Sequence, residues 1–302
     1  MQQAQSKATR GTILGFIGVA IFSLTLPLTH IAVKELDPIF VSVGRTVAAG
    51  LCAIAVLLAT KQPWPHVKDA WRLAVVAGGV VLGFPILSSL AMKTAPASHG
   101  SVVLALLPLG TALMSRVFAG ERPSRQFWLW SVLGSACVIV YALWDGGTAL
   151  QGADLLLVLS VIAASTGYAA GGALSRTLGG WQVICWALVG ALPVTIPLAA
   201  MAWQWVPGTV SMTSWACFAY LALMSQLVGF FAWNRGLALG GVAKVGQVQL
   251  LQTFMTQLAA AAMLGEALSL RSLLFAGMVA LCVWFGRKAQ VKLAKNFSGA
   301  KS

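Results

Sequence analysis

The chain has 302 residues, of which 59% are hydrophobic and only 9% are charged. Soluble proteins carry roughly a quarter charged residues, so this sequence lacks the polar residues that a water-exposed surface requires. The net charge of +13 does not indicate nucleic acid, because Lys and Arg lie between apolar stretches and no nucleic-acid-binding motif occurs. Composition therefore excludes a soluble protein and predicts that the lipid bilayer is a partner.

Ten apolar segments follow one another along the chain. A hydrocarbon core about 30 Å thick needs about 20 apolar residues per helix. The segments cover residues 11–33, 38–59, 71–92, 96–119, 127–144, 153–175, 182–203, 213–234, 242–263 and 268–286. Their connections are too short for a soluble domain. We expect an all-α membrane protein with ten transmembrane helices, forming a single transmembrane domain over 1–302 with a basic cytoplasmic tail at 287–302.

The distribution of basic residues predicts the orientation. Sixteen Lys and Arg residues fall on the side that holds both termini, and three fall on the other side. Cytoplasmic loops are enriched in Lys and Arg, so we expect both termini in the cytoplasm. All Trp residues except Trp186 lie near predicted span ends, Trp233 among them. An interfacial aromatic belt explains this placement, and a substrate cage is the alternative.

The two halves of the chain are weakly similar. Placing residues 17–34 over 159–176 brings Ser23 onto Ser165, and placing 108–121 over 253–266 aligns two closing Gly-Glu pairs. The order fits two five-helix repeats, at about 11–144 and 153–286. Because five is odd, the second repeat enters the membrane from the opposite side. Transporters use such inverted repeats to build a solute site at the midplane.

The segments LLPLGTALMSRVFAGERPS at 106–124 and LLQTFMTQLAAAAMLGEALSLR at 250–271 resemble the drug/metabolite transporter superfamily in its EamA-type ten-helix branch. Length and character are most similar to the YddG-type amino-acid exporters. Arg45 also sits where the first half of such proteins often carries an Arg. Thr253 replaces proline at the counterpart of Pro108, a departure that removes the signal for a broken helix in the second half.

The resemblance implies a secondary transporter that exports small organic solutes by alternating access across a bacterial inner membrane. Amino acids, including aromatic ones, or related metabolites are the implied substrates. A carrier or flippase for a drug, nucleotide-sugar or lipid remains an alternative, as does an intramembrane enzyme acting on a lipid. The sequence contains no P-loop, HExxH or GxSxG motif, so we expect no enzyme, no cofactor, no metal and no obligate protein partner.

Charged residues within or beside the spans have two interpretations each. The seven acids fall at span ends or in loops, where Glu121 could pair with Arg125 four residues on. Arg45, inside the second span, could reach toward the surface or pair with Asp37. Alternatively, Arg45 is the counter-ion of a substrate carboxylate.

Polar residues at mid-depth are the candidates for binding a solute. The ninth span places Gln249, Gln252, Thr253 and Thr256 within about 100° of one helical face. Such a face lines a wet cavity or forms hydrogen bonds between helices. The candidate substrate-binding residues are Ser23, His30, His99, Ser165, Tyr168, Gln226, Gln249 and Gln252.

Three pairs of glycines are spaced four residues apart, at 79/83, 167/171 and 236/240. Small residues at this spacing let two membrane helices approach closely. We therefore interpret these pairs as packing faces.

Overall fold

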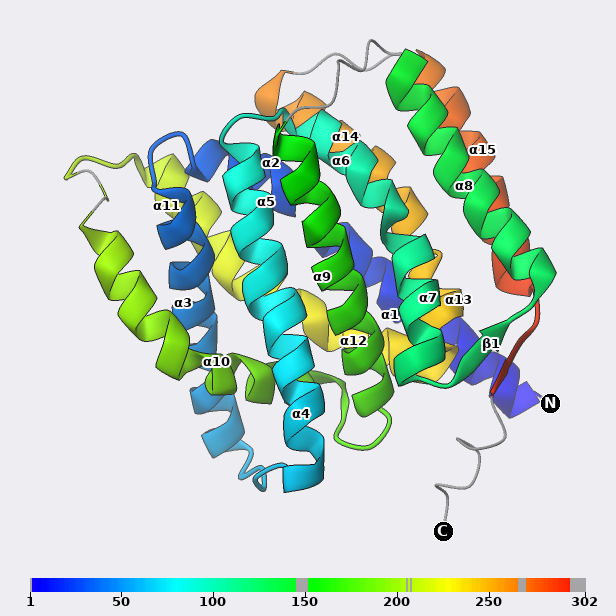
Figure 1. The fold of residues 1–302 in the computed structure, drawn as a ribbon, viewed down its shortest axis with the longest axis horizontal. Coiled ribbons are helices and arrows are strands. Elements are labelled where there is room, and N and C mark those ends of the chain that lie inside the picture. The colour runs from blue at the N-terminus through cyan, green and yellow to red at the C-terminus, as the bar shows by residue number, and fades with distance from the viewer. Residues whose placement is uncertain (1, 145–151, 205, 207, 266–269, 294–302) are drawn as a thin grey trace.

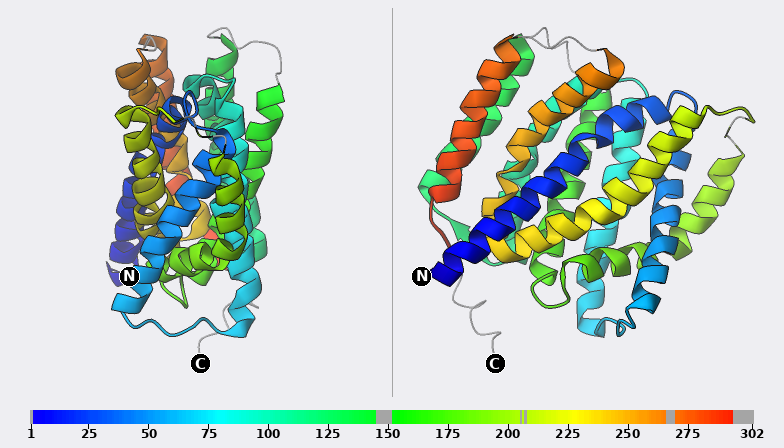
Figure 2. Two further views of the ribbon diagram at one scale, coloured as in Figure 1. Left: turned by 90° about the vertical axis from the view of Figure 1, so that its left-hand side faces the viewer. Right: turned by 180° about the vertical axis from the view of Figure 1, so that it is seen from behind.

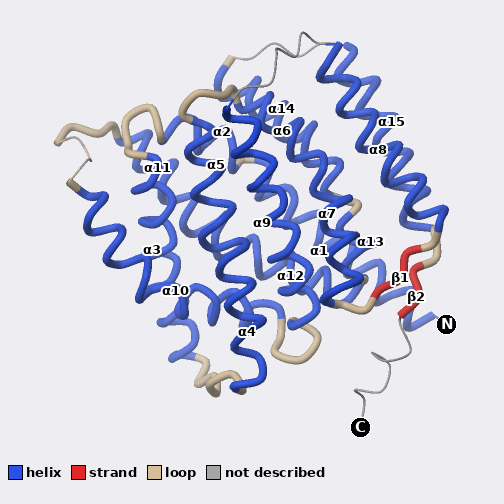
Figure 3. The backbone as a smooth tube through the Cα atoms, viewed as in Figure 1, coloured by secondary structure: helices blue, strands red, loops and turns tan. Residues whose placement is uncertain are grey.

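The computed structural model describes residues 2–144, 152–204, 206, 208–265 and 270–293, which form a bundle of helices with one short sheet (Figures 1 and 3). In the first half the elements are α1 (Gln2–Ser23), α2 (Thr25–Ala32), α3 (Pro38–Ala59), α4 (Val67–Val76), η1 (Ala77–Gly83), α5 (Phe84–Met92), α6 (Ala97–Val103), η2 (Leu104–Leu106), α7 (Leu107–Phe118), β1 (Glu121–Pro123) and α8 (Arg125–Trp144). In the second half they are α9 (Gly152–Leu174), α10 (Gly180–Trp203), α11 (Met212–Tyr220), η3 (Leu221–Val228), α12 (Gly229–Gly240), α13 (Val242–Gly246), α14 (Gln249–Leu264), α15 (Leu270–Lys288) and β2 (Val291–Leu293).

Seven helices within the described residues are long and apolar enough to cross a bilayer. They cover Ser6–Ala32, Pro38–Ala59, Val67–Met92, Ala97–Phe118, Gly152–Leu174, Gly180–Trp203 and Met212–Gly240, and Gly277–Gly286 is a shorter apolar helix. The expected class is confirmed, since the chain is an all-helical, multi-pass membrane protein. The expected number of ten spans stays a prediction.

Corresponding spans of the two halves share the same irregularities. The third span of each half contains a π-helix, η1 in the first half and η3 in the second. The fourth span of each half is interrupted, by the 3₁₀ turn η2 in the first and between α13 and α14 in the second. The second interruption, at residues 247–248, occurs without a proline, which is why sequence reasoning gave no signal for it.

Prolines explain the irregularities of the first half, because proline has no N–H for the carbonyl one turn earlier. Side chains from other helices bond the carbonyls that these prolines leave free. Thr256 Oγ1 donates to the carbonyl of Ser23, four residues before Pro27. Thr46 Oγ1 donates to the carbonyl of Val81, four residues before Pro85. Ser135 Oγ donates to the carbonyl of Ala105, which lies in the 3₁₀ turn η2, three residues before Pro108.

The glycine pairs do form packing faces, as predicted. A Cβ on Gly79 would lie 2.5 Å from the carbonyl oxygen of Ala163, so η1 and α9 meet at their backbones. A Cβ on Gly236 would lie 2.7 Å from the backbone nitrogen of Gly15, which brings α12 equally close to α1. Figure 2 shows α1 and α12 side by side from behind. These contacts hold helices of the second half close against helices of the first.

The interfacial interpretation of Trp233 is wrong. Its side chain is 0% exposed and packs edge-on against Phe22 and Tyr168, with ring centroids 6.2 and 5.3 Å away. The eighth span was expected to end at residue 234, but α12 continues to Gly240. Trp233 therefore lies inside its helix, in the protein core.

Candidate functional site

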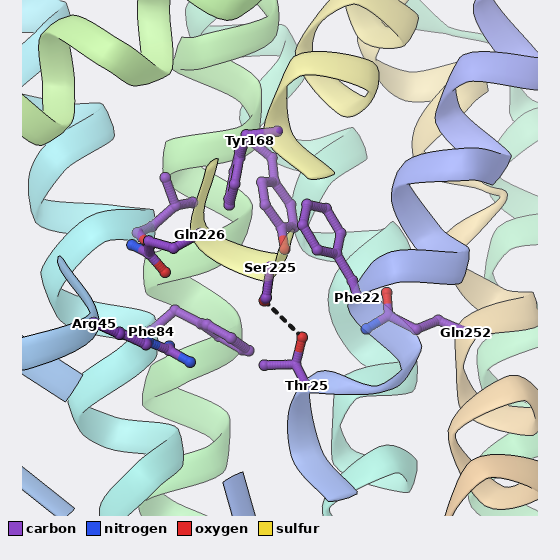
Figure 4. A pocket seen from close by; sticks show the side chains of 10 residues that line it. Phe22, Thr25, Arg45, Phe84, Tyr168, Ser225, Gln226 and Gln252 are labelled. Atoms are coloured by element: carbon purple, nitrogen blue, oxygen red, sulfur yellow. Dashed lines mark hydrogen bonds between the residues drawn. The ribbon is translucent and has the colours of Figure 1, made fainter. Parts of the chain in front are cut away.

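A pocket lies between the two halves of the chain, and residues of both halves line it (Figure 4). Its lining comes from α1, α2, α3, η1 and α5 of the first half and from α9, η3, α12 and α14 of the second. The lining residues are Phe22, Thr25, Arg45, Val80, Phe84, Tyr168, Ser225, Gln226, Phe230 and Gln252. The cavity holds about 10 Å³, which is the room of about one water molecule. The lining side chains therefore lie close together.

Two hydroxyls join the halves across the pocket. Thr25 follows the break between α1 and α2, and Ser225 lies in the π-helix η3. Their oxygens are 2.8 Å apart, and both side chains are buried. Both helix irregularities thus direct a polar group into the same space, as π-helices often do at functional sites.

Gln226, in the π-helix η3, bonds to the π-helix η1 of the other half across the pocket. Its amide nitrogen donates to the carbonyls of Val80 at 3.2 Å and Val81 at 3.4 Å, both in η1. Figure 4 shows its amide oxygen turned toward the pocket. Gln226 therefore joins the two repeat-related π-helices and leaves an acceptor for a solute.

Arg45 is a buried cation for which the described residues supply no counter-ion. Its side chain is 1% exposed, and neither Nε nor Nη1 has a hydrogen-bond partner. Asp37 is not its partner, because Asp37 Oδ1 accepts from the backbone N–H groups of Ile39 and Phe40 and caps α3. The expected surface position and the expected pair with Asp37 are therefore both wrong. A buried, unpaired charge is costly, so the site is suited to a ligand that supplies an anion.

Aromatic rings form an apolar wall of the same pocket. Phe22 lies 5.0 Å from Phe230 and 6.3 Å from Tyr168 between ring centroids, and Tyr168 lies 5.9 Å from Phe230. Such rings bury large apolar areas and prefer these offset or tilted contacts. The pocket thus combines one cation with an apolar surface.

The structure brings three of the eight candidate residues, Tyr168, Gln226 and Gln252, together in the lining. The other five lie outside it. Ser23 Oγ donates to Ala20 O, His30 Nδ1 is 3.0 Å from Met92 O, and His99 Nε2 is 2.6 Å from Asp154 Oδ1. Gln249 Oε1 accepts from Thr111, and the buried Ser165 hydroxyl has no partner.

The polar face of the ninth span serves mainly to bond neighbouring helices. Thr253 donates to Ser101 O, Thr256 donates to Ser23 O, and Gln249 accepts from Thr111. Gln252 differs, because it reaches the pocket and its Oε1 is buried without a hydrogen-bond partner among the described residues. Arg45, which also lines the pocket, was considered in the sequence as a possible counter-ion of a substrate carboxylate. The lining residues for which the sequence gave no expectation are Phe22, Thr25, Val80, Phe84, Ser225 and Phe230.

Two carboxylates join the halves away from the pocket. Glu121, 2% exposed, accepts from Arg176 Nη2 at 2.6 Å and from the N–H groups of Val242 and Ala243 at 2.8 Å each. Its expected pairing with Arg125 is wrong. At the other end of the bundle, Glu35 accepts from the N–H and hydroxyl of Ser211 at 2.7 and 2.9 Å. The hydrogen bond from the backbone N–H of Ser211 is the largest cause that lowers the pKa of Glu35. The hydrogen bond from the Ser211 hydroxyl lowers it further.

A small pocket between two similar halves of a helical bundle, with polar groups directed into it from interrupted helices, is the architecture of a membrane carrier. The chain belongs to the EamA-like transporter family, which matches residues 9–143 and again residues 151–285. The two matches show that the chain contains two repeats, as expected. Their bounds lie within two residues of the expected 11–144 and 153–286, which stay a prediction.

Named relatives agree with this class. The chain is 42% identical to the "Uncharacterized transporter YdeK" of Bacillus subtilis, over 94% of this chain and 99% of that protein. It is 27% identical to the "Probable terminal-alkyne amino-acid exporter" of Streptantibioticus cattleyicolor, over 59% of this chain and 60% of that protein. A protein of known crystal structure shares the fold, with a TM-score of 0.71 at 19% identity over 91% of this chain and 97% of that one.

Proposed function

We propose that the chain is a secondary transporter that exports amino acids, including aromatic ones, or related small organic solutes across a bacterial inner membrane. It does so by alternating access through the pocket, with ten spans arranged as two inverted five-helix repeats and both termini in the cytoplasm. The observation that carries this proposal is Arg45, a buried guanidinium that lines the pocket and has no counter-ion among the residues that the structure describes. A substrate carboxylate supplies the missing negative charge, and charge-assisted bonds to guanidinium are strong.

The other lining residues fit the rest of such a solute. The rings of Phe22, Tyr168 and Phe230 suit an apolar or aromatic side chain, and the amides of Gln226 and Gln252 suit polar atoms near the carboxylate. The amino-acid exporter among the relatives supports this substrate class, although it matches only 59% of the chain.

The size of the pocket supports alternating access. A cavity of about 10 Å³ has room for about one water and cannot hold an amino acid. The two halves must therefore separate around the lining before a solute binds. The Thr25–Ser225 hydrogen bond crosses between the halves at this place, so opening the pocket breaks it and frees two hydroxyls for the solute.

We propose no obligate protein partner. The partners are the small-molecule substrate and the lipid bilayer. A drug, nucleotide-sugar or lipid carrier is the competing class, and a lipid-modifying enzyme is a more distant one.

Counterflow in proteoliposomes tests the proposal. Vesicles with purified protein are loaded with unlabelled L-phenylalanine, L-leucine, UDP-glucose or a short-chain phospholipid and are then exposed to the matching labelled compound. We expect exchange of the two amino acids, and loss of about tenfold or more in the Arg45→Gln variant, because a charged hydrogen bond contributes about 1.5–3 kcal/mol. Arg72→Gln is the control, since that guanidinium lies over the Trp71 ring at the surface. Exchange of UDP-glucose or phospholipid alone would replace this proposal with the competing class.

A further inference from the structure

We infer that the pocket recognises the carboxylate and the apolar body of its substrate, and that the substrate's ammonium group is dispensable. The inference rests on the proposed function and deepens it. It predicts that simple monocarboxylates with aliphatic or aromatic bodies are ligands as good as the corresponding amino acids.

The charges around the pocket are one-sided. Arg45 lines it, and none of its ten lining residues is an acid. The acids of the described residues all lie elsewhere: Glu35 binds Ser211, Asp37 caps α3, Asp69 is in the first turn of α4, Glu121 binds Arg176 and Asp154 binds His99. A carboxylate in the pocket therefore neutralises a buried charge, whereas an ammonium there finds no ion partner.

Neutral groups do not replace the missing acid. An ammonium could donate to Oε1 of Gln252, which is buried without a partner. However, a neutral acceptor does not compensate the desolvation of a full charge, and the guanidinium of Arg45 repels a second cation in the same low-dielectric space. The Gln252 oxygen is equally well satisfied by a neutral donor, such as a water molecule or a hydroxyl.

The aromatic wall does not supply a cation site either. A cation binds over the open face of a ring. The rings of Phe22, Tyr168 and Phe230 lie against one another, and Trp233 packs edge-on against Phe22 and Tyr168. This packing presents an apolar surface to the solute rather than an aromatic cage around it.

Substrate classes follow from these contacts. A solute with one carboxylate and an apolar body satisfies both the cation and the wall. An amine without a carboxylate leaves Arg45 unpaired and adds a second positive charge. A solute with a cationic side chain adds an uncompensated charge as well, and a dicarboxylate brings an anion for which the lining has no second cation.

Three compounds with the same aromatic body separate the two groups: L-phenylalanine, 3-phenylpropanoate without the ammonium, and phenethylamine without the carboxylate. Binding is measured as the shift in thermal unfolding of the purified protein, and transport as competition against counterflow of labelled phenylalanine. We expect 3-phenylpropanoate to act at least as well as phenylalanine and phenethylamine to be about tenfold or more weaker. In Arg45→Gln the difference between the acid and the amine disappears, whereas Arg72→Gln retains it.

The outcomes distinguish this inference from the proposed function. If carboxylates stabilise the protein in an Arg45-dependent way but none is exchanged, the proposed function fails and the inference stands. If phenylalanine is exchanged and 3-phenylpropanoate neither binds nor competes, the ammonium is required and the inference is overturned. It is also overturned if phenethylamine equals phenylalanine, or if none of the three compounds binds.

Discussion

The carboxylate of Glu121 lies 2.6 Å from the guanidinium of Arg176, and the two residues belong to different repeats of the chain. The same carboxylate accepts the first two N–H groups of α13, at Val242 and Ala243. One side chain thus fixes the segment after α7, in the first repeat, to the turn after α9 and to the start of α13 in the second.

We therefore expect Glu121→Ala to destabilise the protein by about 2 to 4 kcal/mol, because it leaves buried N–H groups and a partly buried guanidinium without partners. Thermal unfolding in detergent, followed by Trp fluorescence, measures the loss. Arg125→Gln is the matched control, since Arg125 is exposed, and its midpoint should stay near that of the wild type. If both substitutions lowered the unfolding midpoint equally, the result would support the Glu121–Arg125 pair that was expected from the sequence.

Gln252→Leu should impair exchange and leave the unfolding midpoint near the wild-type value. The side chain reaches the pocket, and its Oε1 bonds to no group of the residues that the structure describes. Thr256→Val is the control on the same helix, because Thr256 donates to Ser23 O outside the lining. Loss of one such interhelical bond costs about 0.6 kcal/mol, so Thr256→Val should still exchange solute. A collapse in stability of Gln252→Leu would instead make Gln252 a packing residue.

Adjacent glycines in η1 provide a sharp comparison. A Cβ on Gly79 would lie 2.5 Å from Ala163 O, whereas a Cβ on Gly78 would meet nothing within 4 Å. Gly79→Ala must push η1 away from α9 and should cost about 2 kcal/mol or more. Gly78→Ala should be neutral or slightly stabilising, since it only restricts the unfolded chain. Similar unfolding midpoints for both variants would show that the two helices are not in close contact.

The proposed orientation is testable with single cysteines in a background without the five native ones. We expect His66→Cys to react with an impermeant thiol reagent only after the membrane is opened, and Thr209→Cys to react in intact cells. Both positions are exposed. The connection at 145–154, of which 145–151 lie outside the described residues, is expected to face outward too. Labelling of position 66 from outside would reverse the whole topology.

Energy coupling gives the last prediction. Proton-driven carriers commonly use a buried carboxylate in the pathway, and no described acid lines the pocket. We expect either exchange driven by the substrate gradient alone or coupling through His30 or His99. A facilitator exchanges solute without a pH gradient, also in the His30→Gln/His99→Gln double variant. Concentrative uptake driven by a pH gradient, and retained in that double variant, would contradict both versions and place a span-end carboxylate in the pathway.

Hydropathy and charge predicted the helices well because they depend on local composition. The span expected at 38–59 is α3, Pro38–Ala59, and the family matches end within two residues of the predicted repeats. Glu121 is a residue whose contacts could not be predicted from local spacing. The expected pair with Arg125 assumed helical spacing, but Glu121–Pro123 is extended and pairs with Val291–Leu293 (Figure 3). The partner of Glu121 is 55 residues away in sequence.

The pocket was only partly predictable. Tyr168, Gln226 and Gln252 were found because polar groups in the middle of apolar spans are unusual. Phe22, Phe84 and Phe230 were missed because aromatic residues are ordinary in a membrane helix, and only packing shows which of them face the cavity. The surroundings of Arg45 depend on how α3 is rotated against helices of both halves, which no pattern within its own span reveals.

The two π-helices have a consequence for how carriers of this kind diverge. A π turn holds one residue more than an α turn, and removing that residue rotates everything beyond it by about 100° relative to the preceding helix. In the third span such a deletion would swing Phe84 away from the cavity, and in the eighth it would reorient Ser225 and Gln226. A single-residue gap in either span therefore changes the chemistry of the pocket as thoroughly as several substitutions would, while every lining residue stays the same in an alignment.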